Sequence, residues 1–147
     1  MIFSQTHAWL TSVSPHTGLP KTQTRRLPNP EYIYRCQETD GRRFLTEINR
    51  VKGTIIAIYV LRAWHIRSVY EVGHTYAIQP GRGKKAVGRF RLASIRVERP
   101  GDIAIVDAQA EGCRDIEHYR RLWNEIHPDT KWESNPKVIV LEMEPVL

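Results

Sequence analysis

The sequence has little cysteine and lacks the short pairings that metal sites need. Its only cysteines, Cys36 and Cys113, lie far apart in the chain. Two cysteines do not make a disulfide framework in a chain that is long enough to bury its own core, so both are expected to be free thiols. The six histidines form no His-Glu-x-x-His motif, and no Cys-x-x-Cys pair is present. These absences argue against a zinc deaminase or another metal hydrolase, and no metal or cofactor is predicted.

Long hydrophobic runs are also missing. No apolar stretch approaches the roughly 18 to 20 residues that cross a bilayer. The segment from Met1 to Gln5 lacks the charged region and apolar core of a signal peptide. We therefore expect a cytoplasmic protein with no membrane partner.

Composition and charge are those of an ordinary folded protein with an anionic partner. The chain has 147 residues, of which 41% are hydrophobic and 26% charged. This length and balance predict one domain over residues 1–147, with no linker or internal repeat. The net charge of +6 favours encounter with a polyanion or with a substrate derived from one. Nucleic acid is the partner class that this charge favours, and no oligomeric state is predicted.

The apolar pattern predicts several strands and one clear helix. Residues 1–30 carry many prolines and glycines, so mostly loop is expected there, with a short strand or helical turn at Trp9 and Leu10. Asp40-Gly41 suits a hairpin turn. The strands are expected at 54–61, 75–79, 86–99 and 137–143, a helical turn capped by Asp102 at 102–106, and a helix from Asp115 to about Ile126. Strands reversed by Gly and Pro turns, with few helices, predict an α+β fold: a small β-barrel with flanking helices.

The segment Lys21-Thr22-Gln23-Thr24-Arg25-Arg26 combines an amine, two hydroxyls and two guanidiniums. In a helical turn, Lys21 and Thr24 would lie on the same side, and a helix start would also offer free backbone N–H groups. The alternative is a basic loop that stays in water, which is the commoner fate of a charge run. Spacing within the segment does not decide between them.

Other polar motifs carry less information. The turn Pro80-Gly81-Arg82-Gly83 lacks the Gly-Lys-Ser/Thr ending of a phosphate-binding loop, so a hairpin turn is predicted. No serine has the Gly-x-Ser-x-Gly context of a serine hydrolase. Glu111 lies between two small residues before the predicted helix, where it either faces a pocket or pairs with a surface cation. Trp123 and Trp132 are expected to be core aromatics.

Taken in order, four motifs give the chain a family resemblance from about Lys21 to the C-terminus. They are Lys21-x-x-Thr24-x-Arg26, Tyr76-x-x-Gln79-Pro80-Gly81-Arg82-Gly83, Asp107-Ala108-x-Ala110-Glu111-Gly112, and Trp123 with Trp132-x-x-Asn135-Pro136. Together they resemble the ASCH domain family, which is similar to PUA domains. The chain departs from the family pattern at Leu19, where a glycine is usual, and Gly18 lies one residue earlier.

The resemblance implies a single PUA-like β-barrel domain and one of two functions. ASCH proteins have been linked to RNA binding and, in small bacterial members, to hydrolysis of N4-acetylcytidine by a lysine, a threonine and a glutamate. Lys21 and Thr24 match the first two residues, and Glu111 is the best match to the third. The implied site then has Lys21 as base, Thr24 as nucleophile and Glu111 as acid, while substrate binding falls to Arg26, Gln79 and Arg82.

These roles are chemically reasonable for amide hydrolysis without a metal. A neutral lysine amine can take the proton of a threonine hydroxyl, which then attacks the acyl carbon. Desolvation and nearby guanidiniums favour the neutral amine. A buried, protonated Glu111 can protonate the departing N4 of cytosine, and Arg26 or backbone N–H groups can stabilise the oxyanion. The substrate predicted in this way is an N4-acylated cytosine nucleoside.

The rival function is a non-catalytic RNA-binding module. The basic residues around Arg82 to Arg91 would then contact phosphates, and Trp64 or Tyr76 would stack on a base. A ribonuclease is less favoured, because no histidine pair is suitably placed for acid and base work. A cavity that holds Lys21, Thr24 and Glu111 together favours the enzyme, whereas an open basic groove favours the binding module.

Overall fold

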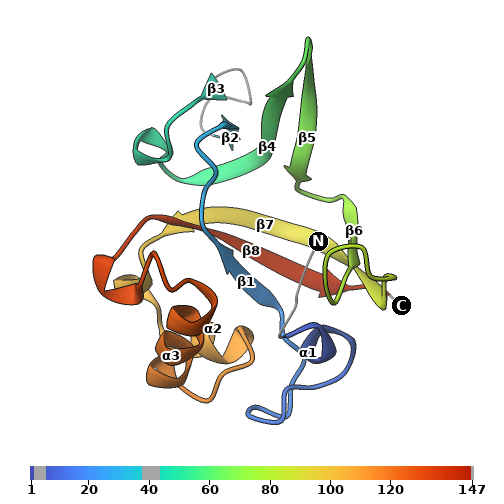
Figure 1. Ribbon diagram of the computed structural model, residues 1–147, viewed down its shortest axis with the longest axis vertical. Helices are drawn as coiled ribbons and strands as arrows, with labels where there is room; N and C mark the ends of the chain where they lie inside the picture. The colour runs from blue at the N-terminus through green and yellow to red at the C-terminus, as the bar shows by residue number, and fades with distance from the viewer. Residues whose placement is uncertain (2–5, 38–43, 147) are drawn as a thin grey trace.

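A large antiparallel sheet forms the framework of the protein (Figure 1). The computed structural model describes residues 1, 6–37 and 44–146. The strands follow the order β1-β8-β7-β4-β2-β3, with β5 paired to β4 and β6 paired to β7. Their bounds are β1 Gln23–Arg26, β2 Tyr32–Cys36, β3 Phe44–Leu45, β4 Thr54–Arg62, β5 His65–Glu71, β6 Thr75–Ile78, β7 Gly88–Glu98 and β8 Val138–Pro145. The expectation of an α+β fold rich in antiparallel strands is confirmed at this level.

The helices are short and lie beside the β1 and β8 end of the sheet (Figure 1). They are α1 His7–Thr11, α2 Ile105–Ala110 and α3 Ile116–Ile126, with single 3₁₀ turns η2 Ile48–Arg50, η3 Pro100–Asp102 and η4 Trp132–Ser134. Within the described ranges, no helix is both long and apolar enough to cross a membrane.

Strand β8 is buried on both faces and separates two hydrophobic clusters. Ile139 and Leu141 belong to the sheet cluster, whose buried members are Tyr34, Cys36, Val51, Ile55, Ile58, Leu92, Ile95, Ile139 and Leu141. Val138 and Val140 belong to the helix cluster, made of Ile103, Ala108, Cys113, Tyr119, Trp123, Val138 and Val140. Successive side chains of a strand point to opposite faces, so β8 packs the sheet interior on one side and α2 and α3 on the other. Its continuous apolar run reflects this burial on both sides.

Helix α3 forms as the sequence predicts. The Asp115 carboxylate accepts a hydrogen bond from the His118 N–H at 2.8 Å and so caps the helix start. Tyr119 and Trp123, four residues apart, are buried on one face. Trp123 and the partly buried Trp132 are core aromatics, as expected.

Several strand predictions are confirmed, and the turn between 75–79 and 86–99 is a hairpin because β6 pairs antiparallel with β7. Strands β2 and β3 also pair antiparallel, although the predicted Asp40-Gly41 turn between them lies outside the described residues. The helical turn around Trp9 and Leu10 is α1. Cys36 and Cys113 are both buried, and neither is part of a disulfide.

The local structure differs from the sequence-based expectations in three places. The Lys21–Arg26 segment does not start a helix, because residues from Gln23 onward pair with β8 and form β1. Asp102 ends a 3₁₀ turn instead of capping a helix at 102–106; α2 begins at Ile105 after Ala104. Strand β5 was not predicted, since His65 to Glu71 is largely exposed and lacks a strong apolar alternation. Pairing with β4 stabilises it despite this weak local signal.

Candidate functional site

Two of the predicted site residues, Lys21 and Glu111, form a buried ion pair. The Nζ atom of Lys21 lies 3.2 Å from Oε1 of Glu111, and their side chains are only 5% and 2% exposed. Lys21 lies two residues before β1, and its backbone N–H donates to the Trp9 carbonyl. Glu111 is the C-terminal cap of α2, in a helix that was not predicted at this position. Two residues 90 positions apart in the sequence thus meet where the start of β1 adjoins the end of α2.

Glu111 binds a second cation as well. Nη1 of Arg25 lies 3.2 Å from Oε2 of Glu111, and Nη2 of the same guanidinium lies 3.0 Å from Oε2 of Glu98. Burial alone would lower the pKa of Arg25, but the Glu111 and Glu98 carboxylates raise it. The carboxylate of Glu111 is therefore held between an ammonium and a guanidinium.

The charged network continues beyond Glu111 along β1, β7 and β8. Gln23 accepts a hydrogen bond from Arg25 at 3.0 Å and donates to Asp107 at 2.9 Å. Arg96 forms ion pairs with Glu98, Asp107 and Glu142. Burial lowers the pKa of Arg96, and its bonds to Glu98 and Glu142 more than offset this. These contacts hold Arg25, and through it Glu111, in a fixed position.

Burying this many charges is costly, and the cost identifies the cluster as a candidate site. A buried ion pair loses its hydration, and well-packed apolar residues in its place are often equally or more stable. Charged groups that are buried and coupled in this way occur preferentially at functional sites. Tyr119 extends the effect, because burial and the neighbouring Glu111 carboxylate raise its pKa well above the usual range for tyrosine.

Thr24, the predicted nucleophile, points away from this network. Thr24 pairs with Leu141 and Arg25 pairs with Val140. Leu141 belongs to the sheet cluster and Val140 to the helix cluster. The Thr24 side chain therefore lies on the face of β1 opposite to Arg25, the residue that reaches Glu111. In a helical turn Lys21 and Thr24 would lie on the same side. Here residues 23–26 form a strand, in which neighbouring side chains point to opposite faces.

A different hydroxyl contacts the lysine. Oγ1 of Thr6 accepts a hydrogen bond from Nζ of Lys21 at 3.1 Å, and both residues are buried. Sequence reasoning did not select Thr6. It carries no motif, and its contact with Lys21 depends on how the N-terminal segment packs on β1.

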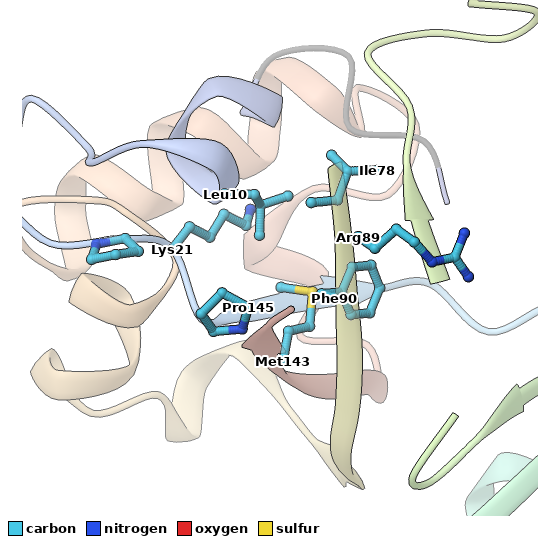
Figure 2. Close-up of a pocket in the computed structure, with 8 residues that line it drawn as sticks. Leu10, Lys21, Ile78, Arg89, Phe90, Met143 and Pro145 are labelled. Carbon is cyan, nitrogen blue, oxygen red and sulfur yellow. The ribbon is translucent and has the colours of Figure 1, made fainter. Parts of the chain in front are cut away.

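A small cavity lies next to Lys21. Figure 2 shows the Lys21 side chain extending toward Leu10, with Phe90 and Met143 nearby. The cavity measures about 10 Å³, which is roughly the space of one water molecule. Its lining is formed by Leu10, Pro20, Lys21, Ile78, Arg89, Phe90, Met143 and Pro145.

The three predicted substrate-binding residues come from two segments, Arg26 from β1 and both Gln79 and Arg82 from the turn after β6. Arg26 pairs with Ile139, on the same face of β1 as Thr24. Gln79 follows β6, and its backbone N–H donates to the Met1 carbonyl at 2.8 Å. Arg82 is exposed in the turn between β6 and β7. Of these, Gln79 directly follows Ile78, which lines the cavity at Lys21.

Cys113 borders the site, and its environment predicts a pH effect on stability. Burial and the nearby Glu111 carboxylate raise the pKa of the Cys113 thiol to about 12, from 9.0 when it is unperturbed. Above pH 9 the unfolded chain loses this proton while the folded protein keeps it, so the free energy of unfolding falls. The slope from this one group is at most about 1.4 kcal/mol per pH unit, and it ends near pH 12.

The measurement is urea unfolding at several pH values. Between pH 9 and 11, Cys113→Ala is expected to lose stability less steeply than the wild type, whereas below pH 8 the two proteins should differ by a constant amount. Buried Tyr70, whose pKa is raised to about 12, contributes to the slope of both proteins equally. Parallel curves across the whole range would contradict the assignment.

No cluster of three or more His, Cys, Asp or Glu side chains suitable for a metal ion occurs among the residues that the structure describes. The candidate site consists of proton donors and acceptors that contact one another: Thr6, Lys21, Arg25, Glu111 and Tyr119. Comparison of the chain with protein-family models, with curated proteins and with solved structures gives no match.

Proposed function

We propose that the protein is an amidohydrolase that removes the acyl group from N4-acylated cytosine nucleosides such as N4-acetylcytidine. The observation that supports this proposal is the buried contact of 3.2 Å between Lys21 and Glu111. The resemblance to ASCH domains assigned these two residues to one site before their contact was known. The same resemblance implies that the sheet closes as a small PUA-like barrel.

The ion pair suits the chemistry because a single proton shift prepares both partners. Moving a proton from Nζ of Lys21 to Oε1 of Glu111 leaves a neutral amine and a protonated carboxyl group. The amine can then accept the proton of a hydroxyl nucleophile, for which Thr24 is the prediction from sequence, and the carboxyl group can protonate the leaving nitrogen. In this reaction, side chains alone handle the protons.

The direct test is release of cytidine from N4-acetylcytidine, followed by ultraviolet absorbance. The purified protein is expected to turn over the nucleoside with saturation kinetics, and liquid chromatography should show cytidine and acetate in equal amounts. A panel of the acylated base, the nucleoside and an acetylated RNA oligonucleotide identifies the preferred substrate. Absence of cytidine release from every member of the panel would contradict the proposed function.

A second function, RNA binding, is favoured by one observation. Trp64, in the turn between β4 and β5, is 99% exposed. Arg62, which pairs with Glu31, and Arg67 are exposed in the same β4–β5 hairpin, so this hairpin carries an exposed aromatic ring and two exposed cations. Bases stack on exposed aromatics, and cations contact phosphates. Salt-dependent RNA binding that Trp64→Ala weakens, without any turnover, would favour this function over the enzyme.

A further inference from the structure

We infer that Thr6, and not Thr24, supplies the nucleophilic hydroxyl of the proposed amidohydrolase. The inference rests on the proposed function and on one arrangement of three side chains. Nζ of Lys21 lies 3.1 Å from Oγ1 of Thr6 and 3.2 Å from Oε1 of Glu111. A nucleophile must lie within hydrogen-bond reach of the base that takes its proton. Thr6 meets this condition in the folded protein.

The Thr6 hydroxyl is not used by the helix that it precedes. Thr6 is the N-cap residue of α1, and a threonine in this position commonly caps the helix with its side-chain oxygen. Here the side chain makes no capping hydrogen bond. Its oxygen instead accepts from Lys21. A buried threonine is thus directed toward a charged amine and away from its usual structural partner.

Thr24 is placed differently. It lies on the face of β1 opposite to Arg25 and points toward the sheet cluster with Leu141. Arg25 and Lys21 both contact Glu111. Arg25 therefore reaches Glu111 from the face of β1 opposite to Thr24, and Thr6 is the threonine whose hydroxyl contacts Lys21.

The reaction balances with water as the only co-reactant. Lys21 first passes a proton to Glu111. Neutral Lys21 then takes the Thr6 hydroxyl proton while the Thr6 oxygen bonds to the acyl carbon, and the resulting oxyanion collapses as the C–N4 bond breaks. Glu111 gives its proton to N4, which restores the ammonium and the carboxylate and leaves an ester on Thr6.

Water cleaves the ester by the same route. Lys21 again passes a proton to Glu111 and takes one from water, whose oxygen bonds to the acyl carbon. The bond from this carbon to the Thr6 oxygen breaks, and Glu111 returns a proton to Thr6. The products are cytidine and the carboxylic acid, which loses its proton to solvent.

Peptide mapping distinguishes the two threonines. The protein is mixed with N4-acetylcytidine, quenched in acid within the first turnover and digested with trypsin. Cleavage after Lys21 and Arg25 places Thr6 in the peptide 1–21 and Thr24 in the peptide 22–25. We expect the acetyl mass on 1–21, with fragmentation locating it at Thr6. Acetyl on 22–25 overturns the inference.

Two substitutions provide the kinetic test. Thr6→Val keeps the side-chain shape and removes the hydroxyl, so kcat is expected to fall at least about a thousandfold. Thr6→Ser keeps the hydroxyl and should retain activity within about tenfold of the wild type. Thr11→Val, which removes an exposed hydroxyl at the end of α1, is the control and should keep wild-type turnover; loss of turnover in Thr24→Val but not in Thr6→Val overturns the inference. These variants decide the matter if the ester breaks down too fast to be captured.

The outcomes separate this inference from the proposed function. If the wild type releases cytidine but Thr6→Val retains wild-type kcat, the amidohydrolase stands and Thr6 is not its nucleophile. If the wild type releases no cytidine, the proposed function and this inference both fail. Circular dichroism of each variant establishes that a lost activity does not reflect lost folding.

Discussion

Lys21→Met is expected to lower kcat/KM for N4-acetylcytidine by at least about a thousandfold while leaving the protein folded. The substitution removes the amine that contacts both Thr6 and Glu111, and with it the base of the proposed reaction. Loss of an acid–base residue typically costs about 10²- to 10⁴-fold in rate. Arg25 still pairs with Glu111 in the variant, so one buried carboxylate keeps one cation.

Glu111→Gln makes the complementary test, with a larger effect on stability. It leaves Lys21 and Arg25 buried together without the carboxylate between them. Breaking a buried ion pair in this way costs roughly 3 to 5 kcal/mol. Urea unfolding should therefore show Glu111→Gln to be clearly less stable than Lys21→Met, although both lose activity.

The matched control is Lys84→Met, which removes an exposed lysine in the turn after β6. It should keep both the activity and the stability of the wild type. Wild-type turnover in Lys21→Met would remove Lys21 from the mechanism. Equal stability of the Lys21 and Glu111 variants would show that the two cations do not share Glu111 in solution.

Gly112→Ala is expected to lower the free energy of unfolding by about 2 to 5 kcal/mol. Gly112 has a φ of +93°. A residue with a side chain adopts such a backbone conformation at a cost of about 1 to 2 kcal/mol. An added Cβ would also lie 2.4 Å from Cε3 of Trp9, and overpacking of this kind costs about 1 to 3 kcal/mol. The Gly112 carbonyl accepts a hydrogen bond from buried Ser14, so the backbone has little freedom to move away.

Gly83→Ala separates the two causes. Gly83 has a similar φ of +72°, but nothing lies within 4 Å of its added Cβ. Chemical denaturation of the two variants should therefore differ by the cost of the Trp9 contact alone. Introducing Trp9→Leu into the Gly112→Ala protein should recover part of the loss, and additive effects of the two substitutions would argue against the clash.

Local patterns in the sequence were enough for much of the framework. Helix α3 has a capping Asp115 and apolar residues at helical spacing, and neither signal depends on distant parts of the chain. Strand β4 follows from its β-branched run. The hairpin of β6 and β7 follows from the glycines and proline of its turn. Each of these elements is determined by residues that are close to one another in the sequence.

Elements that depend on partners were missed. The local pattern of residues 21–26 favours a solvated loop over a helical turn, and only pairing with β8 makes residues 23–26 a strand. Strand β5 is mostly exposed and owes its existence to β4. Helix α2 begins at Ile105 without a side-chain cap, and Ala108 packs in the helix cluster. In each case a contact with a distant segment outweighs a weak local preference.

From the sequence alone, residue types and local spacing predicted an α+β chain, and the resemblance to ASCH domains, carried by four ordered motifs, pointed to Lys21, Thr24 and Glu111 as candidate site residues. The tertiary structure decided which groups meet. It brings Lys21 to Glu111 at 3.2 Å and Thr6 to Lys21 at 3.1 Å, and strand alternation turns Thr24 to the other face. The Thr6 hydroxyl lies beside the Lys21 amine because the N-terminal segment packs next to β1. This packing cannot be predicted from the spacing of residues within either segment.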